Sequence, residues 1–374
     1  MANSLQVVWV KKNTSVNSRQ PSFKFLDVRD SQRMEMEDLI GVLLDKKRGR
    51  TKFQLADDLR QTPKQIDTVL NLIKTEGLYN LVTSTDSQSG KVVYQLSTQV
   101  TRQEEYHAGN RFSENGVIRF GAIANTRIGN SLSRLDTLDA FYRICQRKGI
   151  KTVFHCGDIL EGVERKATQG EVLLHEADAQ VKYFTKAFPL VEGVETYFIT
   201  APHHEGSFID SDRLQIGAYM EAMARKNGRT DLHYLGHREV DVHVKVGGET
   251  AIVRLAHVTG NVPYADSYPM QKYIESMQGG TKPHVVLMGH TGKLETILYR
   301  EVWGVQVGSF IDQTPSMRAG RRSTQVGGQI IELWKPRKEE ENFHGTQFAL
   351  TGEEFNFFNS EFYQQNPEYN RRPA

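Results

Sequence analysis

The sequence contains no long apolar run and almost no excess of either charge. No stretch of about 18 consecutive apolar residues occurs, which excludes a membrane-spanning helix. Residues 1–6 are polar and lack the basic and then apolar pattern of a secretory signal peptide. The formal net charge is only +2 over 374 residues, so any basic surface that binds nucleic acid must be local. We expect a soluble, cytoplasmic protein with no membrane partner and enough residues for two domains.

Cysteine is scarce, since Cys145 and Cys156 are the only two. Two cysteines are too few for a disulfide framework and fit a reducing compartment. Cys156 lies close to Asp158 at the end of a predicted strand, so a role as a metal ligand has to be considered. Because neighbouring side chains of a strand point to opposite faces, we favour the interpretation of Cys156 as a small buried apolar residue.

Residues 1–30 form an N-terminal arm without a pattern that indicates chemistry, and residues 31–100 carry the signals of a small helical domain. Apolar residues at helical spacing predict a first helix, which ends in a basic turn at residues 46–50. Thr51 and Thr62 are each followed three residues later by glutamine, which is the capping-box pattern of a helix start. Two further helices are therefore predicted, near residues 53–59 and 63–76.

A hairpin is predicted after these helices, with strands at residues 81–83 and 92–96 around a polar tip. Three helices and a two-stranded wing resemble the layout of winged helix-turn-helix modules that bind DNA. In that interpretation, DNA or RNA contacts basic and polar side chains of the helix junction and the third helix, namely Lys46, Lys47, Arg48, Arg50, Lys52, Lys64 and Gln65. The alternative is that the domain binds protein or packs on its neighbour, and that these charges form a solvated face.

The polar residues 101–116 are predicted to be a linker, and residues 117–335 are predicted to be a layered α/β domain. Strand patterns alternate with helical patterns up to about residue 226, and strand patterns follow one another from residue 232 to residue 333. This order predicts two sheets packed between helices. Residues 336–374 form a polar tail rich in aromatic residues, so we expect part of it to lie on the globular body or on a protein partner.

Four predicted strands end in polar residues that are able to bind a metal ion. In chain order, the residues at these ends are Asp158, then His203 with His204, then His257 and then His290. Ligands of open α/β sheets bind at the carboxyl ends of the strands. A single histidine after a strand is weak evidence for a metal site, but four such ends that supply one aspartate and several histidines predict a shared site.

The order of these groups resembles that of the calcineurin-like metallophosphoesterases, whose motifs D-x-H, G-D, G-N-H-D/E, H and G-H-x-H each follow a strand. The corresponding residues here are Asn125-Thr-Arg127, Gly157-Asp158, Pro202-His-His-Glu205, His257 and Gly289-His-Thr-Gly292. Residues 265–292 and 308–328 are similar to a branch that is common in phages and archaea and that often carries an N-terminal winged helix. The resemblance implies a metallophosphoesterase α/β/β/α sandwich preceded by a small winged-helix domain, and the host cytoplasm as the location if a phage encodes the chain.

The resemblance also implies two metal positions that share Asp158, and this sequence departs from the first of them. The other residues of that first position are Asn125, Arg127 and Gly292. Neutral asparagine is a poor ligand, glycine has no side chain and arginine stays charged, so this position is degenerate. The second position keeps Asp158, His203, His257 and His290, a donor set that suits a transition metal. We therefore expect at most one divalent ion, Mn, Zn or Fe.

Three residues are the candidates for catalysis. The resemblance implies that Asp158 is the shared metal ligand and that His204 approaches the leaving group as a general acid. Arg127 stands where the first ion would lie, and we expect it to lie near Asp158 and to compensate its charge. Because a guanidinium does not lower the pKa of a bound water as a metal ion does, weak hydrolysis or none is predicted.

Three functions stay open at this point. The first is a nucleic-acid-associated protein with a degenerate dinuclear site, weakly active or non-catalytic, which binds DNA through the winged helix. The second is an active metal-dependent phosphodiesterase or nuclease that acts on DNA or RNA. The third is a scaffold that binds protein without metal, with the aromatic tail as one docking segment. A homo-oligomer is also left open, and a shift of one residue in the motif match would exchange the roles of His203 and His204.

Overall fold

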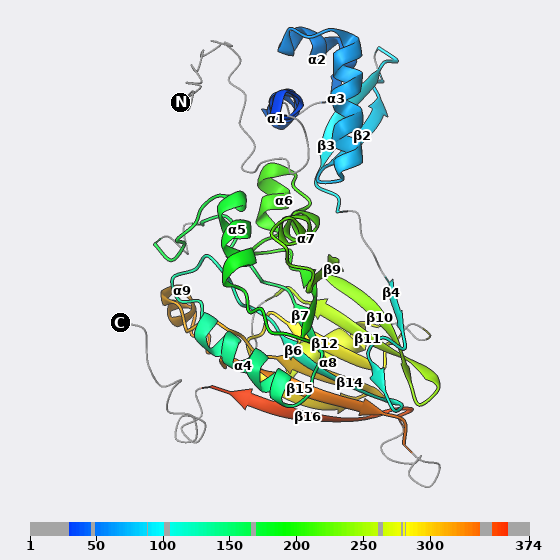
Figure 1. The fold of residues 1–374 in the computed structure, drawn as a ribbon, viewed down its shortest axis with the longest axis vertical. Helices are drawn as coiled ribbons and strands as arrows, with labels where there is room; N and C mark the ends of the chain where they lie inside the picture. The colour runs from blue at the N-terminus through cyan, green and yellow to red at the C-terminus, as the bar shows by residue number, and fades with distance from the viewer. Residues whose placement is uncertain are drawn as a thin grey trace, which may run out of the picture. The chain divides into compact units, whose positions relative to one another are not determined.

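The computed structural model describes residues 30–45, 49–87, 89–100, 105–165, 170–260, 265–277, 280, 282–336 and 346–357. These residues form two compact units, and the boundary between them lies between Ser97 and Thr98 (Figure 1). No helix in these ranges is long and apolar enough to cross a membrane. The predicted arm at residues 1–30 falls outside them except for its last residue.

The described part of the N-terminal unit consists of three helices and a three-stranded antiparallel sheet. In chain order the elements are α1 (Asp30–Asp45), β1 (Arg50–Thr51), α2 (Lys52–Leu59), α3 (Pro63–Glu76), β2 (Asn80–Thr85) and β3 (Val92–Ser97). β3 is the central strand of the sheet. The apolar helix faces pack together and bury Met36, Leu39, Leu55, Ile66 and Ile73. The helices and the hairpin lie where the sequence predicts them, and β1 is an additional short strand.

Both predicted capping boxes are present. The Thr62 hydroxyl accepts a hydrogen bond from the Gln65 backbone, and the Gln65 side chain accepts one from the Thr62 backbone at 2.9 Å. Thr51 and Gln54 make the same pair of bonds at the start of α2. α3 ends at Gly77, whose φ of +67° is a left-handed conformation that glycine adopts without strain. Local hydrogen bonding therefore sets these helix boundaries.

The second unit contains two mixed sheets. The first has the strand order β16-β15-β6-β7-β8-β9, with β5 (Ser113–Glu114) paired to β6. Strands β6 (Val117–Ile123), β7 (Thr152–Cys156), β8 (Glu195–Thr200) and β9 (Leu232–His237) run parallel to one another. β15 (Gly327–Trp334) pairs antiparallel with β6, and β16 (Ala349–Asn356) pairs antiparallel with β15. The carboxyl ends of the four parallel strands therefore share one edge.

The second sheet has the order β13-β14-β12-β11-β10-β4. Its strands are β4 (Glu105–Gly109), β10 (Glu239–Val246), β11 (Glu249–His257), β12 (Val285–Gly289), β13 (Leu294–Tyr299) and β14 (Val302–Val307). β11, β12 and β14 are parallel, β4 is parallel to β10, and the pairs β10–β11 and β13–β14 are antiparallel. This sheet also delivers the carboxyl ends of β11 and β12 to a common edge.

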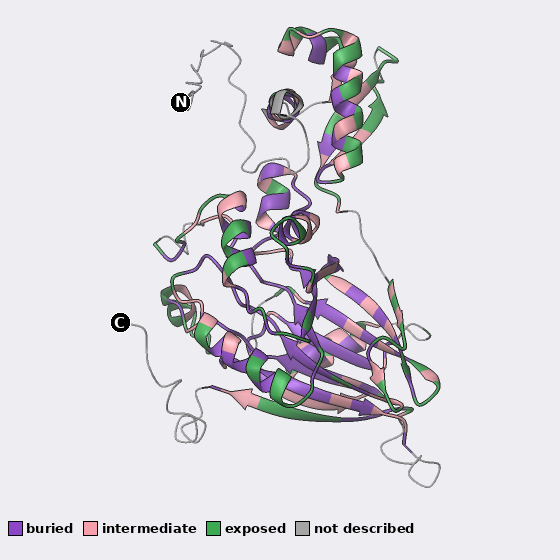
Figure 2. Ribbon diagram, viewed as in Figure 1, coloured by how far each residue is buried: buried purple, intermediate pink, exposed green. Residues whose placement is uncertain are grey.

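Buried side chains of both sheets belong to one core cluster. Figure 2 shows that much of the ribbon of these strands is buried. Along β10, the valines at alternate positions are buried, whereas the residues between them are partly or fully exposed. Phe120 and Phe154 of the first sheet belong to the same core as these valines. This alternation is what two sheets packed face to face require.

Helices cover the outer faces of the sandwich. α4 (Leu135–Arg147), α5 (Ala177–Ala187) and α7 (Ile216–Lys226) lie over the first sheet, and α6 (Ser207–Asp212) precedes α7. α8 (Tyr268–Ser276) covers the second sheet, where Met270 and Ile274 pack on Val286 and Met288. α9 (Pro315–Ala319) is a short helix before β15. The predicted α/β/β/α sandwich is therefore confirmed.

Two segments that were predicted to be linker and tail belong in part to the sandwich. β4 and β5 lie within residues 101–116, and β16 lies within residues 336–374, so the second domain exceeds the predicted range 117–335. β4 was missed because only Tyr106 and Ala108 face the core while polar residues alternate with them. Phe348 and Phe357 are buried, which confirms that part of the tail lies on the body.

Candidate metal centre

Three of the four predicted metal ligands lie together where strands of both sheets end. Asp158 follows β7 of the first sheet, His257 is the last residue of β11, and His290 follows β12 of the second sheet. One ligand atom from each of the three lies within 4.8 Å of the others. β11 and β12 pair in parallel with His257 opposite Gly289, so both histidines reach the same edge.

His257 is oriented by a backbone carbonyl. Its Nδ1 lies 2.6 Å from the carbonyl oxygen of Cys156, so Nδ1 carries the proton and donates to that oxygen. Its Nε2 faces Oδ1 of Asp158 at 3.3 Å. Both atoms are buried, and neither makes a hydrogen bond to any described residue. Two buried electron-pair donors that face each other in this way suit a cation between them.

The Asp158 carboxyl group and the His257 imidazole each shift the pKa of the other. Burial alone would raise the pKa of Asp158, but His204 and His257 outweigh it and hold the pKa of this carboxyl well below its usual value. Burial likewise would lower the pKa of His257, but the Asp158 carboxylate raises it above the ordinary value. Asp158 is therefore ionised, and its carboxylate faces the imidazole of His257.

His203 and His204 follow β8 and contact different residues of the site. The His203 ring lies 5.6 Å from the ring of His290, and burial lowers the pKa of both imidazoles. His204 Nδ1 is 3.0 Å from the carbonyl oxygen of Glu161, and its Nε2 is 3.6 Å from Oδ2 of Asp158. Burial, aided by Arg127, lowers the pKa of His204 to about 3, which disfavours the protonated form that a general acid needs.

Arg127 and Asn125, which the motif match assigned to the first metal position, make hydrogen bonds within the protein. The Arg127 guanidinium makes two hydrogen bonds to the Glu161 carboxylate, at 2.7 Å and 2.6 Å, whereas Asp158 was its predicted partner. Asn125 donates its side-chain amide to the carbonyl of Gly308 at 3.0 Å. Arg127 and Glu161 thus form a buried ion pair, and Gly292 provides no side chain.

Four residues of the site hold a left-handed backbone conformation. φ is +53° at Asn125, +44° at Arg127, +56° at Asp158 and +85° at His290. Such values are unfavourable for residues with a side chain and cluster at functional sites. They turn these side chains away from their strands and towards the common edge.

Glu205 is a site residue that the sequence indicated only as part of a motif. Its carboxylate accepts hydrogen bonds from the backbone N–H of Asp158 at 3.1 Å and of Ala201 at 2.8 Å. Burial and the nearby Asp158 charge raise the pKa of Glu205 to about 8. Glu205 therefore positions the turn that carries Asp158.

A cavity of about 270 Å³ opens beside the cluster. Its walls include His203, His204, His290 and Asp158 together with two arginines that the sequence motifs did not indicate, Arg165 and Arg322. Hydroxyl-bearing residues also line it, namely Ser309, Ser316, Ser323, Thr291 and Thr324. Positive and hydroxyl-bearing side chains around a carboxylate and several imidazoles are able to bind an anion such as a phosphate.

The arrangement of Asp158, His257 and His290 at the rim of two face-to-face mixed sheets is the one that the motif order implies. This sandwich resembles the fold of the calcineurin-like metallophosphoesterases. No protein-family model matches the chain, and no curated protein matches it. At this rim, Asp158, His257 and His290 converge.

Solved structures with similar folds include phosphoesterases. An archaeal phosphodiesterase is 13% identical and covers 64% of this chain and 100% of its own, with a TM-score of 0.32. Vps29 from Entamoeba histolytica, solved with zinc, is 12% identical over 64% of this chain and 99% of its own, with a TM-score of 0.28. A predicted phosphoesterase from Streptococcus pneumoniae is 10% identical over 65% and 99%, with a TM-score of 0.26.

The residues predicted to contact nucleic acid belong to the N-terminal unit and not to the sandwich. Lys46, Lys47 and Arg48 lie outside the described residues. Arg50 and Lys52 form ion pairs with Asp58 at 3.5 Å and with Asp67 at 2.9 Å. Lys64 is exposed on the first turn of α3, and the Gln65 side chain is engaged in the capping box.

Proposed function

We propose that the protein associates with nucleic acid and carries a degenerate metallophosphoesterase site that hydrolyses phosphodiesters weakly or not at all. The observation that carries this proposal is the buried ion pair of Arg127 with Glu161. This ion pair supplies no net charge at the first metal position, where the family motifs imply an ion. A site with one ion lacks half of the paired charge with which dinuclear enzymes stabilise phosphoryl transfer.

The remaining residues fit one divalent ion. Asp158 Oδ1 and His257 Nε2 are buried without hydrogen bonds to described residues, and His290 offers a further ligand atom within 4.8 Å. A carboxylate with imidazoles suits Mn, Zn or Fe, and the His203 ring lies 5.6 Å from that of His290. When bound, such an ion would polarise a phosphoryl oxygen and lower the pKa of a water molecule.

The side chains around this position favour binding of a phosphodiester over its cleavage. Arg165 and Arg322 line the cavity with hydroxyl groups, so a phosphate oxygen would meet charged and neutral donors. Arg127 adds little net charge because Glu161 neutralises it. Burial keeps His204 neutral, so it does not hold the proton that a leaving group requires.

Metal analysis combined with a nuclease assay tests this proposal. The metal content of the intact protein is compared with that of Asp158→Asn, and the difference counts the ions that depend on Asp158. We expect a difference of one ion, with slow or undetectable hydrolysis of DNA and of a generic phosphodiester in the presence of manganese. Asp139→Asn, on the exposed side of α4, is the matched control and should keep the metal content of the intact protein.

The alternatives give different results in the same experiment. A difference of two ions, together with fast turnover that Asp158→Asn abolishes, would establish an active phosphodiesterase. The absence of any Asp158-dependent ion would favour a scaffold that works without metal. Introducing Asn125→Asp, Arg127→His and Gly292→His together should raise the difference to two ions. Glu161→Gln has to accompany them, because Glu161 would otherwise be a buried charge without a partner.

We propose further that the N-terminal unit is a winged-helix domain that binds DNA or RNA. Its support is the order of three helices and a terminal hairpin, with Lys64 exposed at the start of α3. Phosphate contacts would come from Lys46, Lys47, Arg48 and Lys64. The contributions of Arg50 and Lys52 would require exchange of their carboxylate partners for phosphate.

Gel-shift titrations over a range of salt concentrations test the nucleic-acid proposal. Arg48→Ala with Lys64→Ala should weaken binding to all sequences alike and reduce the slope of log K against log salt by roughly 0.9 for each phosphate that is no longer neutralised. Lys74→Ala is the control, because Lys74 lies in the last turn of α3, the helix that also carries Lys64. No shift at low salt with duplex DNA, single strands and RNA would instead favour a protein partner for this unit.

A further inference from the structure

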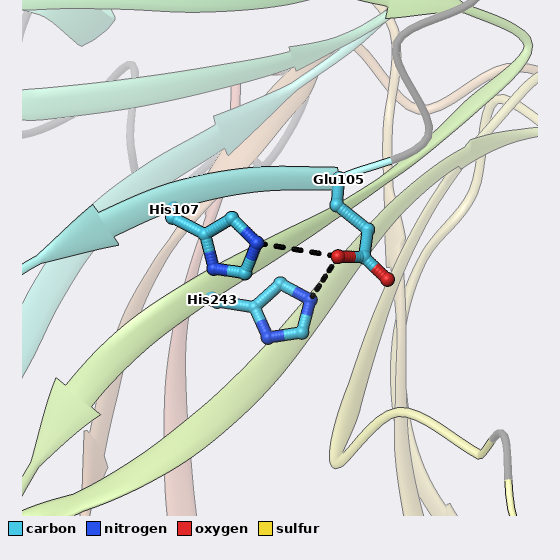
Figure 3. A group of neighbouring side chains, drawn as sticks. All are labelled: Glu105, His107 and His243. Carbon is cyan, nitrogen blue, oxygen red and sulfur yellow. Dashed lines mark hydrogen bonds and ion pairs between the residues drawn. The ribbon is translucent and has the colours of Figure 1, made fainter.

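A second group of metal-binding side chains lies on the second sheet, outside the candidate metal centre. Glu105 and His107 come from β4, and His243 comes from the neighbouring strand β10 (Figure 3). Glu105 Oε2 lies 3.2 Å from Nε2 of His107 and 3.8 Å from Nε2 of His243. Both imidazoles are thus directed at the same carboxylate oxygen.

The strand pairing explains why these three side chains meet. Glu105 and His107 are two residues apart on β4, so they project from the same face of the sheet. β4 runs parallel to β10 with His107 opposite His243. The intervening residues Tyr106 and Ala108 pack towards the core, which places all three polar side chains on the outer face.

The distances match those between ligands of one zinc ion. Zinc holds histidine nitrogen and carboxylate oxygen at roughly 2.0–2.2 Å in tetrahedral geometry, which separates two ligand atoms by roughly 3.3–3.6 Å. The two distances from Glu105 Oε2, 3.2 Å and 3.8 Å, lie around this range. All three ligand atoms lie within 4.8 Å of one another, so small side-chain rotations are enough for coordination.

The contacts of His243 favour a cation over a simple ion pair. Its Nε2 is shielded from solvent and makes no hydrogen bond within the described ranges. The His107 and His243 rings lie 4.5 Å apart at 31°, so protonation of both would place two like charges in contact. One ion between the rings and Glu105 would satisfy the three ligand atoms with both imidazoles neutral.

Two charged side chains beside the group, Asp241 and Arg254, are paired with each other. Asp241 lies opposite Glu105 in the strand register, but its carboxylate makes two hydrogen bonds to Arg254, at 2.6 Å and 2.7 Å. Asp241 therefore neutralises Arg254, which would otherwise repel a cation. The side chains of Glu105 and His107 are 58% and 70% exposed, so water has access to the fourth coordination position.

We propose that Glu105, His107 and His243 bind one divalent transition-metal ion, with zinc as the best match to two imidazoles and a carboxylate. The ion ties the short edge strand β4 to β10. β4 is the first strand of the second unit, and its only strand partner among the described residues is β10. Binding of the ion therefore stabilises the start of this unit.

Zinc titration by calorimetry tests the proposal in full-length protein that carries Asp158→Asn to disable the other metal site. We expect this protein to bind one equivalent of zinc, and adding His107→Gln or His243→Gln to abolish that binding. His175→Gln is the matched control, because His175 also lies near a carboxylate, Glu164 at 3.7 Å, but forms no such three-residue group with the described residues. An unchanged zinc equivalent in both glutamine variants, or no zinc binding in Asp158→Asn alone, would overturn the proposal.

Hydrogen exchange gives a second readout that does not depend on counting ions. In the Asp158→Asn protein, zinc should slow amide exchange in β4 and in the facing part of β10, and His107→Gln should remove this effect. Circular dichroism confirms that each variant is folded. Exchange in β4 that does not respond to zinc, in a protein that binds zinc elsewhere, would also overturn the proposal.

Discussion

At the residue scale, the buried ion pair of Arg127 with Glu161 is the contact on which the proposed function rests. The two side chains are only 5% and 2% exposed. Burial raises the pKa of Glu161, and Arg127 offsets only part of that effect. Such a pair adds little net stability, but either partner alone would be a buried charge without compensation.

Removal of one partner should therefore destabilise the protein strongly. We expect Glu161→Gln to cost about 3–5 kcal/mol in urea-induced unfolding, because the Arg127 guanidinium stays buried without a counter-charge. Arg143→Ala removes an exposed pair with Asp139 and should cost at most about 0.5 kcal/mol. Arg127→Met combined with Glu161→Leu should recover much of the stability. Similar costs for Glu161→Gln and Arg143→Ala would contradict this account.

The two cysteines should be unreactive in the folded protein. Both thiols are buried, and burial raises the pKa of Cys145 to about 12 and that of Cys156 well above its usual value. Because the thiolate is the reactive form, we expect no labelling by a thiol reagent at about pH 8, and labelling of both residues after denaturation. Rapid labelling of native Cys156 would contradict its interpretation as a buried apolar residue.

At the scale of elements, the turn after β7 decides where His257 lies. Gly157 has a φ of +85°, and a Cβ atom there would lie 2.7 Å from Nδ1 of His257 and 3.0 Å from Cβ of Ala201. The absence of a side chain thus lets the end of β7 approach the end of β11. The hydrogen bond from His257 to the Cys156 carbonyl depends on that approach.

Gly157→Ala should disrupt the metal position as well as the turn. We expect loss of the Asp158-dependent metal ion and a lower melting temperature, since His257 has to move. Gly149→Ala is the control: φ is +70°, but no described atom lies within 4 Å of the added Cβ, so it should cost only about 1–2 kcal/mol of backbone strain. Retention of metal by Gly157→Ala would show that His257 is not needed for binding.

At the scale of the whole molecule, the second unit is held together by a core that segments far apart in the chain share. Residues from β6, β10, β12 and β16 contribute to the same cluster between the sheets. β16 extends the first sheet beyond β15, and Phe348 and Leu350 reach the core from this C-terminal segment. The C-terminal strand is therefore a structural part of the sandwich.

Truncation of a core side chain in β16 should accordingly destabilise the sandwich. We expect Leu350→Ala to reduce the free energy of unfolding by about 2–5 kcal/mol, as for other buried leucines. Thr351→Ala, at the next and exposed position, should change it by no more than about 0.5 kcal/mol. Denaturant unfolding measures both, and equal effects would show that β16 is not part of the cooperative core.

Local sequence was sufficient for the features that depend on near neighbours. The capping boxes of α2 and α3 were predictable because each involves residues three positions apart. The polar strand ends at Asp158, His257 and His290 were predictable because an apolar run stops just before each one. Their convergence then followed from topology, since parallel strands present their carboxyl ends at one edge.

Only the tertiary structure decided which side chains pair within these sites. The Arg127 guanidinium binds the carboxylate of Glu161 and not that of Asp158. The Glu205 carboxyl group accepts a hydrogen bond from the backbone N–H of Asp158. His243 meets His107 because β4 joins the edge of the second sheet. Each contact joins segments far apart in the chain and selects one of several partners with similar chemistry. The selection depends on backbone direction at the turns and on strand register, which short-range sequence patterns do not encode.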